Sequence, residues 1–116
     1  MTHTDLVKAL TKPGHDIRNE MTATNAHLIH MVIGISGEAG ELLDAIKKAT
    51  IYQKPLDMEN IIEELGDLEF YMEGLRQKLF LTREEILAHN IQKLQKRYGE
   101  KYSDKAAQER KDKQCP

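Results

Sequence analysis

The sequence predicts an all-α protein built as an antiparallel helix bundle, and three observations support this. Aromatic residues make up only 5% of the chain and Trp is absent, so aliphatic side chains must fill the interior. Such a composition suits helices packed on helices. Apolar residues recur at spacings of three and four, which is the period of an amphipathic helix. Residues that cap helices precede three of these runs.

Residues 1–24 are predicted to form a short helix and a connection. Two leucines four residues apart indicate a helix over 4–11, and Pro13 followed by Gly14 ends it. Residues 15–23 show no clear period, so we expect a loop or a poorly ordered connection there.

A long helix is predicted next, capped by Asn25 or Thr24 and running to about Lys48, before Pro55 breaks the chain. Its apolar residues are spaced three or four apart and form one stripe: Leu28, Val32, Ile35, Ala39, Leu42 and Ile46. We expect this stripe to face the helix that follows.

The following helix begins after Asp57, a good N-cap, with Leu56 and Ile61 placed to form a hydrophobic staple. Its stripe alternates spacings of four and three: Ile61, Leu65, Leu68, Met72, Leu75 and Leu79. The regular alternation makes this the clearest helix in the sequence.

A capping box from Thr82 to Glu85 starts a further helix. Its stripe consists of Leu87, Ile91, Leu94 and Tyr98. Gly99 can end this helix. The residues beyond Tyr102 are strongly polar, so we expect 103–116 to form a disordered tail.

Two pairs of acidic residues lie on the two consecutive long helices with the same spacing. Glu38 and Glu41 are three residues apart on the first helix, and Glu64 and Asp67 on the second. Residues three apart share a helix face, and both pairs lie on the same side of their apolar stripe. If the helices form an antiparallel hairpin with facing stripes, the four carboxylates converge at one edge of the interface.

Converging carboxylates repel one another, so a cation is expected among them. A set of oxygen ligands without Cys or paired His favours a hard cation, Mg²⁺ with Mn²⁺ as a substitute, over zinc. A single acidic pair is usually a solvated helix face, and the matching of two pairs is what favours a metal site. The only cysteine, Cys115, excludes an intramolecular disulfide and fits a reducing compartment.

Asn90, Lys93 and Arg97 fall on one face of the helix that begins after Thr82. An amide donor and two positive charges suit the oxygens of a polyphosphate. Mg²⁺ held by few carboxylates shares its remaining positions with substrate phosphates. Taken alone, these three residues are more often an ordinary polar face; with the acidic pairs, they indicate a cradle for Mg²⁺ and a triphosphate.

Three blocks of sequence carry a resemblance. They are GEAGEL at 37–42, EELGD at 63–67, and Asn90-x-x-Lys93-Leu94-x-x-Arg97-Tyr98. In this order and spacing they resemble the all-α nucleotide pyrophosphohydrolases, and within them the MazG-like proteins, over about residues 26–102. Many members have a further Glu directly before the first motif, where this chain has Gly37, which leaves the number of metal ions open.

The resemblance implies a MazG-like pyrophosphohydrolase domain over 25–102, completed by oligomerisation into a homodimer or a dimer of dimers. It implies Mg²⁺-dependent hydrolysis of (deoxy)nucleoside triphosphates to monophosphate and pyrophosphate, in cleaning of the nucleotide pool. The implied metal ligands are Glu38, Glu41, Glu64 and Asp67. The implied substrate-binding residues are Asn90, Lys93, Arg97 and Tyr98. Glu38 is the candidate catalytic residue, which binds metal or orients and deprotonates the attacking water.

Other classes of protein fit less well. A formal net charge of −2 makes a poor non-specific nucleic-acid binder. No apolar run of about 18 residues and no signal segment is present, so we expect a cytoplasmic protein with neither a membrane nor a nucleic-acid partner. Two alternatives stay open: a dUTP- or dCTP-selective pyrophosphatase, and a non-catalytic helical module whose acidic edge binds a basic partner. The preferred base depends on pocket contacts that no motif reveals.

Overall fold

The computed structural model describes residues 1–99 and 101–110, and in these ranges the protein is helical without strands. The all-α prediction is confirmed.

The chain divides into two compact units, Met1–Tyr71 and Met72–Pro116. No helix within the described ranges combines the length and apolarity needed to cross a membrane. Cys115 lies outside the described residues.

Two short helices open the first unit. α1 (His3–Leu10) begins with a capping box in which Thr2 and Asp5 each accept a hydrogen bond from the other's backbone amide, and it matches the predicted first helix. α2 (Gly14–Glu20) lies where a loop over 15–23 was expected, so that prediction was wrong. A helix this short shows no apolar period. Its own hydrogen bonds, such as the one between the side chains of His15 and Asn19 at 3.0 Å, help to hold it.

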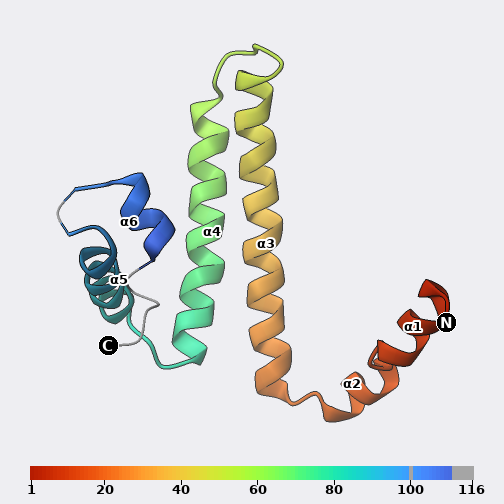
Figure 1. Ribbon diagram of the computed structural model, residues 1–116. Helices are drawn as coiled ribbons and strands as arrows, with labels where there is room; N and C mark the ends of the chain where they lie inside the picture. Colours follow the sequence, from red (N-terminus) through yellow and green to blue (C-terminus); the bar gives the residue numbers. More distant parts are fainter. Residues whose placement is uncertain (100, 111–116) are drawn as a thin grey trace. The chain divides into compact units, whose positions relative to one another are not determined.

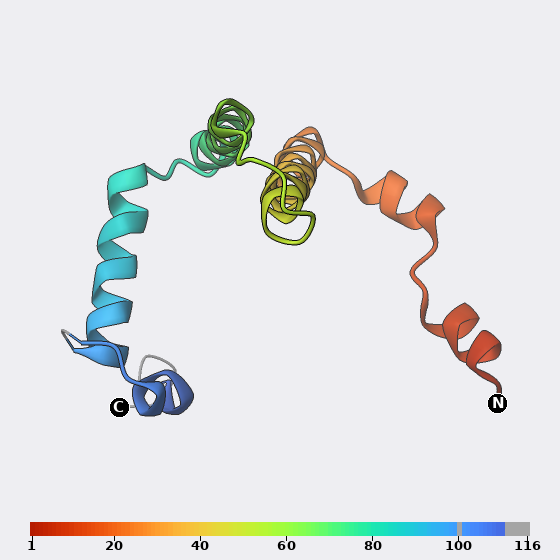
Figure 2. The ribbon, with the colours of Figure 1, turned by 90° about the horizontal axis from the view of Figure 1, so that it is seen from above.

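α3 (Ala23–Thr50) and α4 (Met58–Lys78) form a hairpin in which they lie side by side and antiparallel as far as Tyr71 (Figures 1 and 2). α3 begins earlier than predicted, because the hydroxyl of Thr22 accepts a hydrogen bond from the backbone amide of Asn25 at 3.0 Å. Asp57 caps α4 as predicted, accepting from the amide of Asn60 at 3.1 Å. The carboxylate pairs therefore lie on neighbouring helices.

The faces that meet along this hairpin differ partly from the prediction. Glu38 and Glu64 are half-buried, whereas Leu65, near the centre of the predicted α4 stripe, is 48% exposed and Val32 on α3 is 46% exposed. The buried residues among those described are Met31, Ala45 and Ile61. The predicted apolar stripes are therefore partly buried and partly open to solvent along the hairpin. Glu38 and Glu64 share the half-buried part of this interface, whereas Glu41 and Asp67 are exposed.

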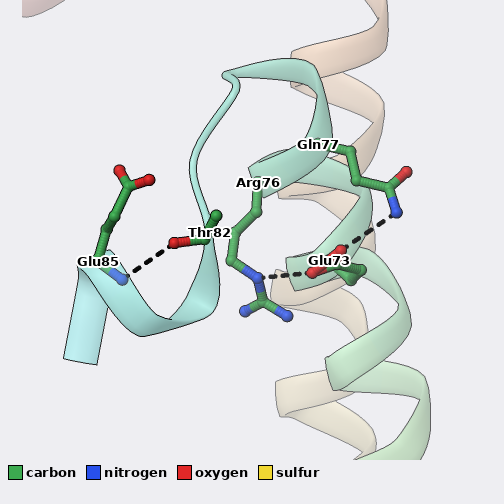
Figure 3. Close-up of polar contacts among 5 residues, drawn as sticks. All are labelled: Glu73, Arg76, Gln77, Thr82 and Glu85. Atoms are coloured by element: carbon green, nitrogen blue, oxygen red, sulfur yellow. Dashed lines mark hydrogen bonds and ion pairs between the residues drawn. The ribbon is translucent and has the colours of Figure 1, made fainter.

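In the second unit, the last turn of α4 leads through a tight turn into α5 (Arg83–Tyr98) (Figure 3). Glu73 accepts hydrogen bonds from Arg76 Nε at 2.9 Å and from Gln77 Nε2 at 3.1 Å. The hydroxyl of Thr82 accepts from the amide of Glu85 at 3.1 Å, which confirms the predicted N-cap. Local hydrogen bonds thus define both sides of this turn.

α5 ends at Gly99, as predicted, with φ of 71°, a conformation that glycine adopts without steric cost. α6 (Asp104–Glu109) follows and packs against α5. Ser103 caps α6, and Ala106 and Ala107 are half-buried. A short helix thus stands within the segment expected to be a polar tail, while residues 111–116 lie outside the described residues.

Candidate active site

The hairpin brings three of the four predicted carboxylates together. Glu38 projects from the middle of α3, and Glu64 and Asp67, one turn apart, project from α4. One carboxylate oxygen from each of the three residues lies within 4.8 Å of the others. Glu38 and Glu64 are half-buried and Asp67 is exposed, so the cluster opens to solvent on the side of Asp67.

Glu64 is the most constrained member of this cluster. Its Oε2 atom is buried and has no hydrogen-bond partner. A buried oxygen without a partner is costly unless something positive or a donor satisfies it. This oxygen is therefore available to a donor or a cation.

The electrostatics of Glu64 agree with this geometry. Its pKa is raised from 4.5 to about 7, first by a hydrogen bond with the Glu38 carboxyl, then by burial and by the charges of Glu38, Glu41 and Asp67. Glu41 is exposed and lies outside the group of three, but its charge still acts on Glu64. Negative charge is thus concentrated around Glu64, and every charged group that shifts its pKa is a carboxylate.

The donor set fits a hard divalent cation. Three carboxylates from two helices, one with an unmatched buried oxygen, supply the hard oxygen ligands that Mg²⁺ and Mn²⁺ prefer. The partly solvated side leaves room for water or substrate oxygens, as Mg²⁺ requires when few carboxylates hold it.

The family model of the MazG nucleotide pyrophosphohydrolase domain matches residues 27–101. The chain belongs to this family. The match spans the α3–α4 hairpin, its carboxylates and α5, and thus confirms the resemblance read from the three sequence blocks. No curated protein and no solved structure matches the chain significantly. Membership in the MazG family supports nucleotide pyrophosphohydrolase activity, and with it a nucleotide substrate.

The predicted substrate-binding residues of this MazG domain all lie on α5, in the second unit. Asn90 is exposed, and Lys93, Arg97 and Tyr98 are half-buried. The Arg97 guanidinium lies over the Tyr98 ring, 5.8 Å from its centroid. Both residues line a hollow of about 440 Å³ between α5 and α6. The last turn of α5 thus presents a cation and an aromatic ring together.

Sequence reasoning missed Tyr71, whose ring lies against α3 near the carboxylate cluster. The ring meets His30 edge-on at 6.2 Å and covers the backbone of Gly34. The available signal was an aromatic residue four positions after Asp67, on the same face of α4. The apolar spacing gave no reason to choose it, because Tyr71 lies outside the predicted stripe.

Proposed function

We propose that this protein is a Mg²⁺-dependent nucleoside triphosphate pyrophosphohydrolase that releases a nucleoside monophosphate and pyrophosphate. One observation carries the proposal: Glu38, Glu64 and Asp67 place oxygens within 4.8 Å of one another, in a chain of the MazG family. The unmatched buried oxygen of Glu64 supports a metal-binding role for this cluster.

The metal ligands in this proposal are Glu38, Glu41, Glu64 and Asp67. When bound, Mg²⁺ neutralises charge on the phosphoryl group and lowers the pKa of a coordinated water. Glu38 also orients the attacking water and accepts its proton as the bond between the α-phosphorus and the bridging oxygen breaks. Pyrophosphate leaves, and the new P–O bond retains the oxygen of the water.

Substrate binding is proposed for Asn90, Lys93, Arg97 and Tyr98. The two cations supply charge-assisted hydrogen bonds to phosphate oxygens, and these bonds strengthen as negative charge moves during the reaction. Tyr98 offers an aromatic surface beside Arg97. These roles give the phosphates of the substrate cationic partners on α5.

A homodimer or a dimer of dimers is the proposed assembly. Among the large apolar side chains, Ile33 and Leu43 on α3 and Phe70 on α4 are 62%, 68% and 69% exposed. Gly37 and Gly40 lie in an unbroken helix, and a Cβ atom added to either would meet nothing within 4 Å in the described chain. Such an open apolar face is what a second copy would cover.

Product analysis tests the proposed function. The protein is incubated with a panel of standard and modified ribo- and deoxynucleoside triphosphates, with Mg²⁺ and with EDTA. Monophosphate and pyrophosphate should form in a 1:1 ratio in the incubations with Mg²⁺, and neither product should form in those with EDTA. Strong preference for dUTP or dCTP would identify the selective alternative. No pyrophosphate from any nucleotide would overturn the proposal in favour of a non-catalytic module.

Paired variants connect the activity to the cluster. Glu64→Gln removes a carboxylate from the cluster, and Glu63→Gln removes the exposed carboxylate beside it, which is outside the cluster. Activity should be lost in Glu64→Gln and preserved in Glu63→Gln. Equal activity in the two variants would show that the chemistry lies elsewhere.

A further inference from the structure

Gly34 and Tyr71 form a close contact between α3 and α4. A Cβ atom placed on Gly34 would lie 2.5 Å from Cγ of the Tyr71 ring and still nearer to its Cδ1 and Cε1 atoms. Real Cβ atoms essentially never approach another heavy atom that closely. Any other residue at position 34 would therefore displace the ring or the helix.

This contact is specific to one glycine. On the same hairpin, a Cβ atom on Gly37, Gly40 or Gly66 would meet nothing within 4 Å. The Tyr71 ring is also fixed from other directions, because it meets the ring of His30 edge-on at 6.2 Å and that of Phe70 at 5.2 Å. Three neighbours thus define where the ring can lie.

The contact lies one helical turn from the carboxylate cluster on both helices. Gly34 precedes Glu38 by four residues, and Tyr71 follows Asp67 by four. Because α3 and α4 are antiparallel, these offsets run in the same direction along the hairpin. An axial or lateral shift at Gly34 and Tyr71 therefore moves Glu38 relative to Glu64 and Asp67.

We propose that the Gly34–Tyr71 contact is a positioning device that fixes the register and spacing of α3 on α4 and so sets the geometry of the carboxylate cluster. The inference rests on the proposed function, because it concerns the metal site named there. Mg²⁺ needs ligand oxygens at about 2.0–2.1 Å in near-octahedral geometry. An added methyl group that forces α3 and α4 to shift against each other would therefore disturb the ligand geometry of the site.

The test measures binding of Mn²⁺ alone to the full chain, by electron paramagnetic resonance of the free ion, so that no turnover is needed. Gly34→Ala should weaken Mn²⁺ binding about 10–100-fold, the range for residues that orient metal ligands. Circular dichroism should show unchanged helicity, since Ala favours helix over Gly. Tyr71→Phe keeps the ring and should bind Mn²⁺ like the unaltered protein.

A double variant separates positioning from a general effect on stability. Tyr71→Leu removes the ring that Gly34→Ala would strike. In the Tyr71→Leu background, adding Gly34→Ala should therefore change the Mn²⁺ dissociation constant less than about twofold. If Gly34→Ala weakens Mn²⁺ binding by the same factor with and without the Tyr71 ring, the positioning role is overturned. Such a result would show that the methyl group acts without the ring.

The outcomes also separate this inference from the proposed function. Mn²⁺ binding that is equally tight in the unaltered protein and in helical Gly34→Ala would overturn the positioning role alone. Absence of Mn²⁺ binding in the unaltered protein would overturn the proposed metal site and, with it, the positioning role.

Discussion

A carboxylate oxygen of Glu38 and one of Glu64 lie within 4.8 Å of each other across the α3–α4 seam. Two carboxyl groups this close favour a state in which one of them keeps its proton. The pKa of Glu64 is accordingly raised, first by hydrogen bonding with the Glu38 carboxyl and then by burial and neighbouring negative charges. A divalent cation needs both groups ionised, so proton and metal compete for the same oxygens.

The metal-free protein should lose stability as the pH rises through about 7. The folded-state pKa of Glu64, about 7, lies above its unfolded value of 4.5. The contribution of Glu64 to the free energy of unfolding is fully present below about pH 4.5 and is lost as the pH rises through 7. Between these pH values the folded state holds a proton that the unfolded state has lost. The melting temperature in EDTA should therefore fall between about pH 5 and pH 8. Glu64→Gln, which has no proton to lose, should flatten that slope; an unchanged slope contradicts the assignment.

Mg²⁺ or Mn²⁺ should raise the melting temperature, and more so at about pH 8 than at about pH 6. At a concentration 100 times its dissociation constant, a ligand that binds only the folded state adds about 2.7 kcal/mol to the free energy of unfolding. Differential scanning fluorimetry measures the shift. Glu64→Gln should reduce it and Glu63→Gln should not. No shift with either ion at millimolar concentration would refute the metal site.

Glu38→Gln keeps the shape of the side chain but removes its charge and its capacity to take a proton. The kcat should fall by at least about 10²–10⁴-fold, the usual loss for a general base, with metal disruption adding to it. Steady-state kinetics with saturating Mg²⁺ measures the loss, and circular dichroism confirms folding. A near-normal kcat would remove Glu38 from the chemistry, although a role in metal binding could survive.

Lys93→Ala and Arg97→Ala should each reduce kcat/KM by an amount equivalent to about 1.5–3 kcal/mol, the range for hydrogen bonds to charged groups. A rise in KM at constant kcat indicates a contact made equally in ground and transition states, whereas a fall in kcat indicates one made in the transition state. Arg83→Ala, which removes an exposed cation from the first turn of the same helix, serves as the control and should have little effect.

Sedimentation should show a dimer or tetramer at micromolar protein concentration, because a single chain leaves Ile33, Leu43 and Phe70 exposed. Gly40→Ala tests whether the open backbone of α3 receives a partner helix. In an isolated helix this change adds about 1 kcal/mol of helix propensity. If a partner's backbone packs there, the added methyl group should weaken association instead. A monomeric unaltered protein would contradict this assembly.

Much of the helical organisation could be predicted, because it depends on local chemistry. Helix ends depend on residues that interact only with near neighbours in the sequence. Asp57 and Thr82 cap helix starts with their side chains, and Gly99 ends α5 through its backbone conformation. α2 escaped prediction because a helix of one or two turns has no periodicity to detect. The start of α3 was misplaced because Thr22, Thr24 and Asn25 can all cap a helix, and only the conformation distinguishes them.

Which carboxylates lie close together could largely be predicted from the sequence, but the geometry of the cluster could not. The matched spacing of the acidic pairs brought Glu38, Glu64 and Asp67 together correctly. Their position in the seam, and the exposure of Leu65, depend on how the two helices are rotated about their axes. That rotation is linked to the contact between Gly34 and Tyr71, which are 37 positions apart in sequence and share no local pattern.

The small number of buried side chains has a consequence for how the stability of this protein is measured. Met31, Ala45 and Ile61 are the buried apolar residues among those that the structure describes. If the remaining apolar surface is buried by association, folding is a bimolecular or higher-order reaction, and its equilibrium constant carries units of concentration. Each tenfold dilution of a dimer that unfolds to two free chains then removes about 1.4 kcal/mol per mole of dimer. The melting temperature is in that case a property of the amount of protein in solution as well as of its sequence.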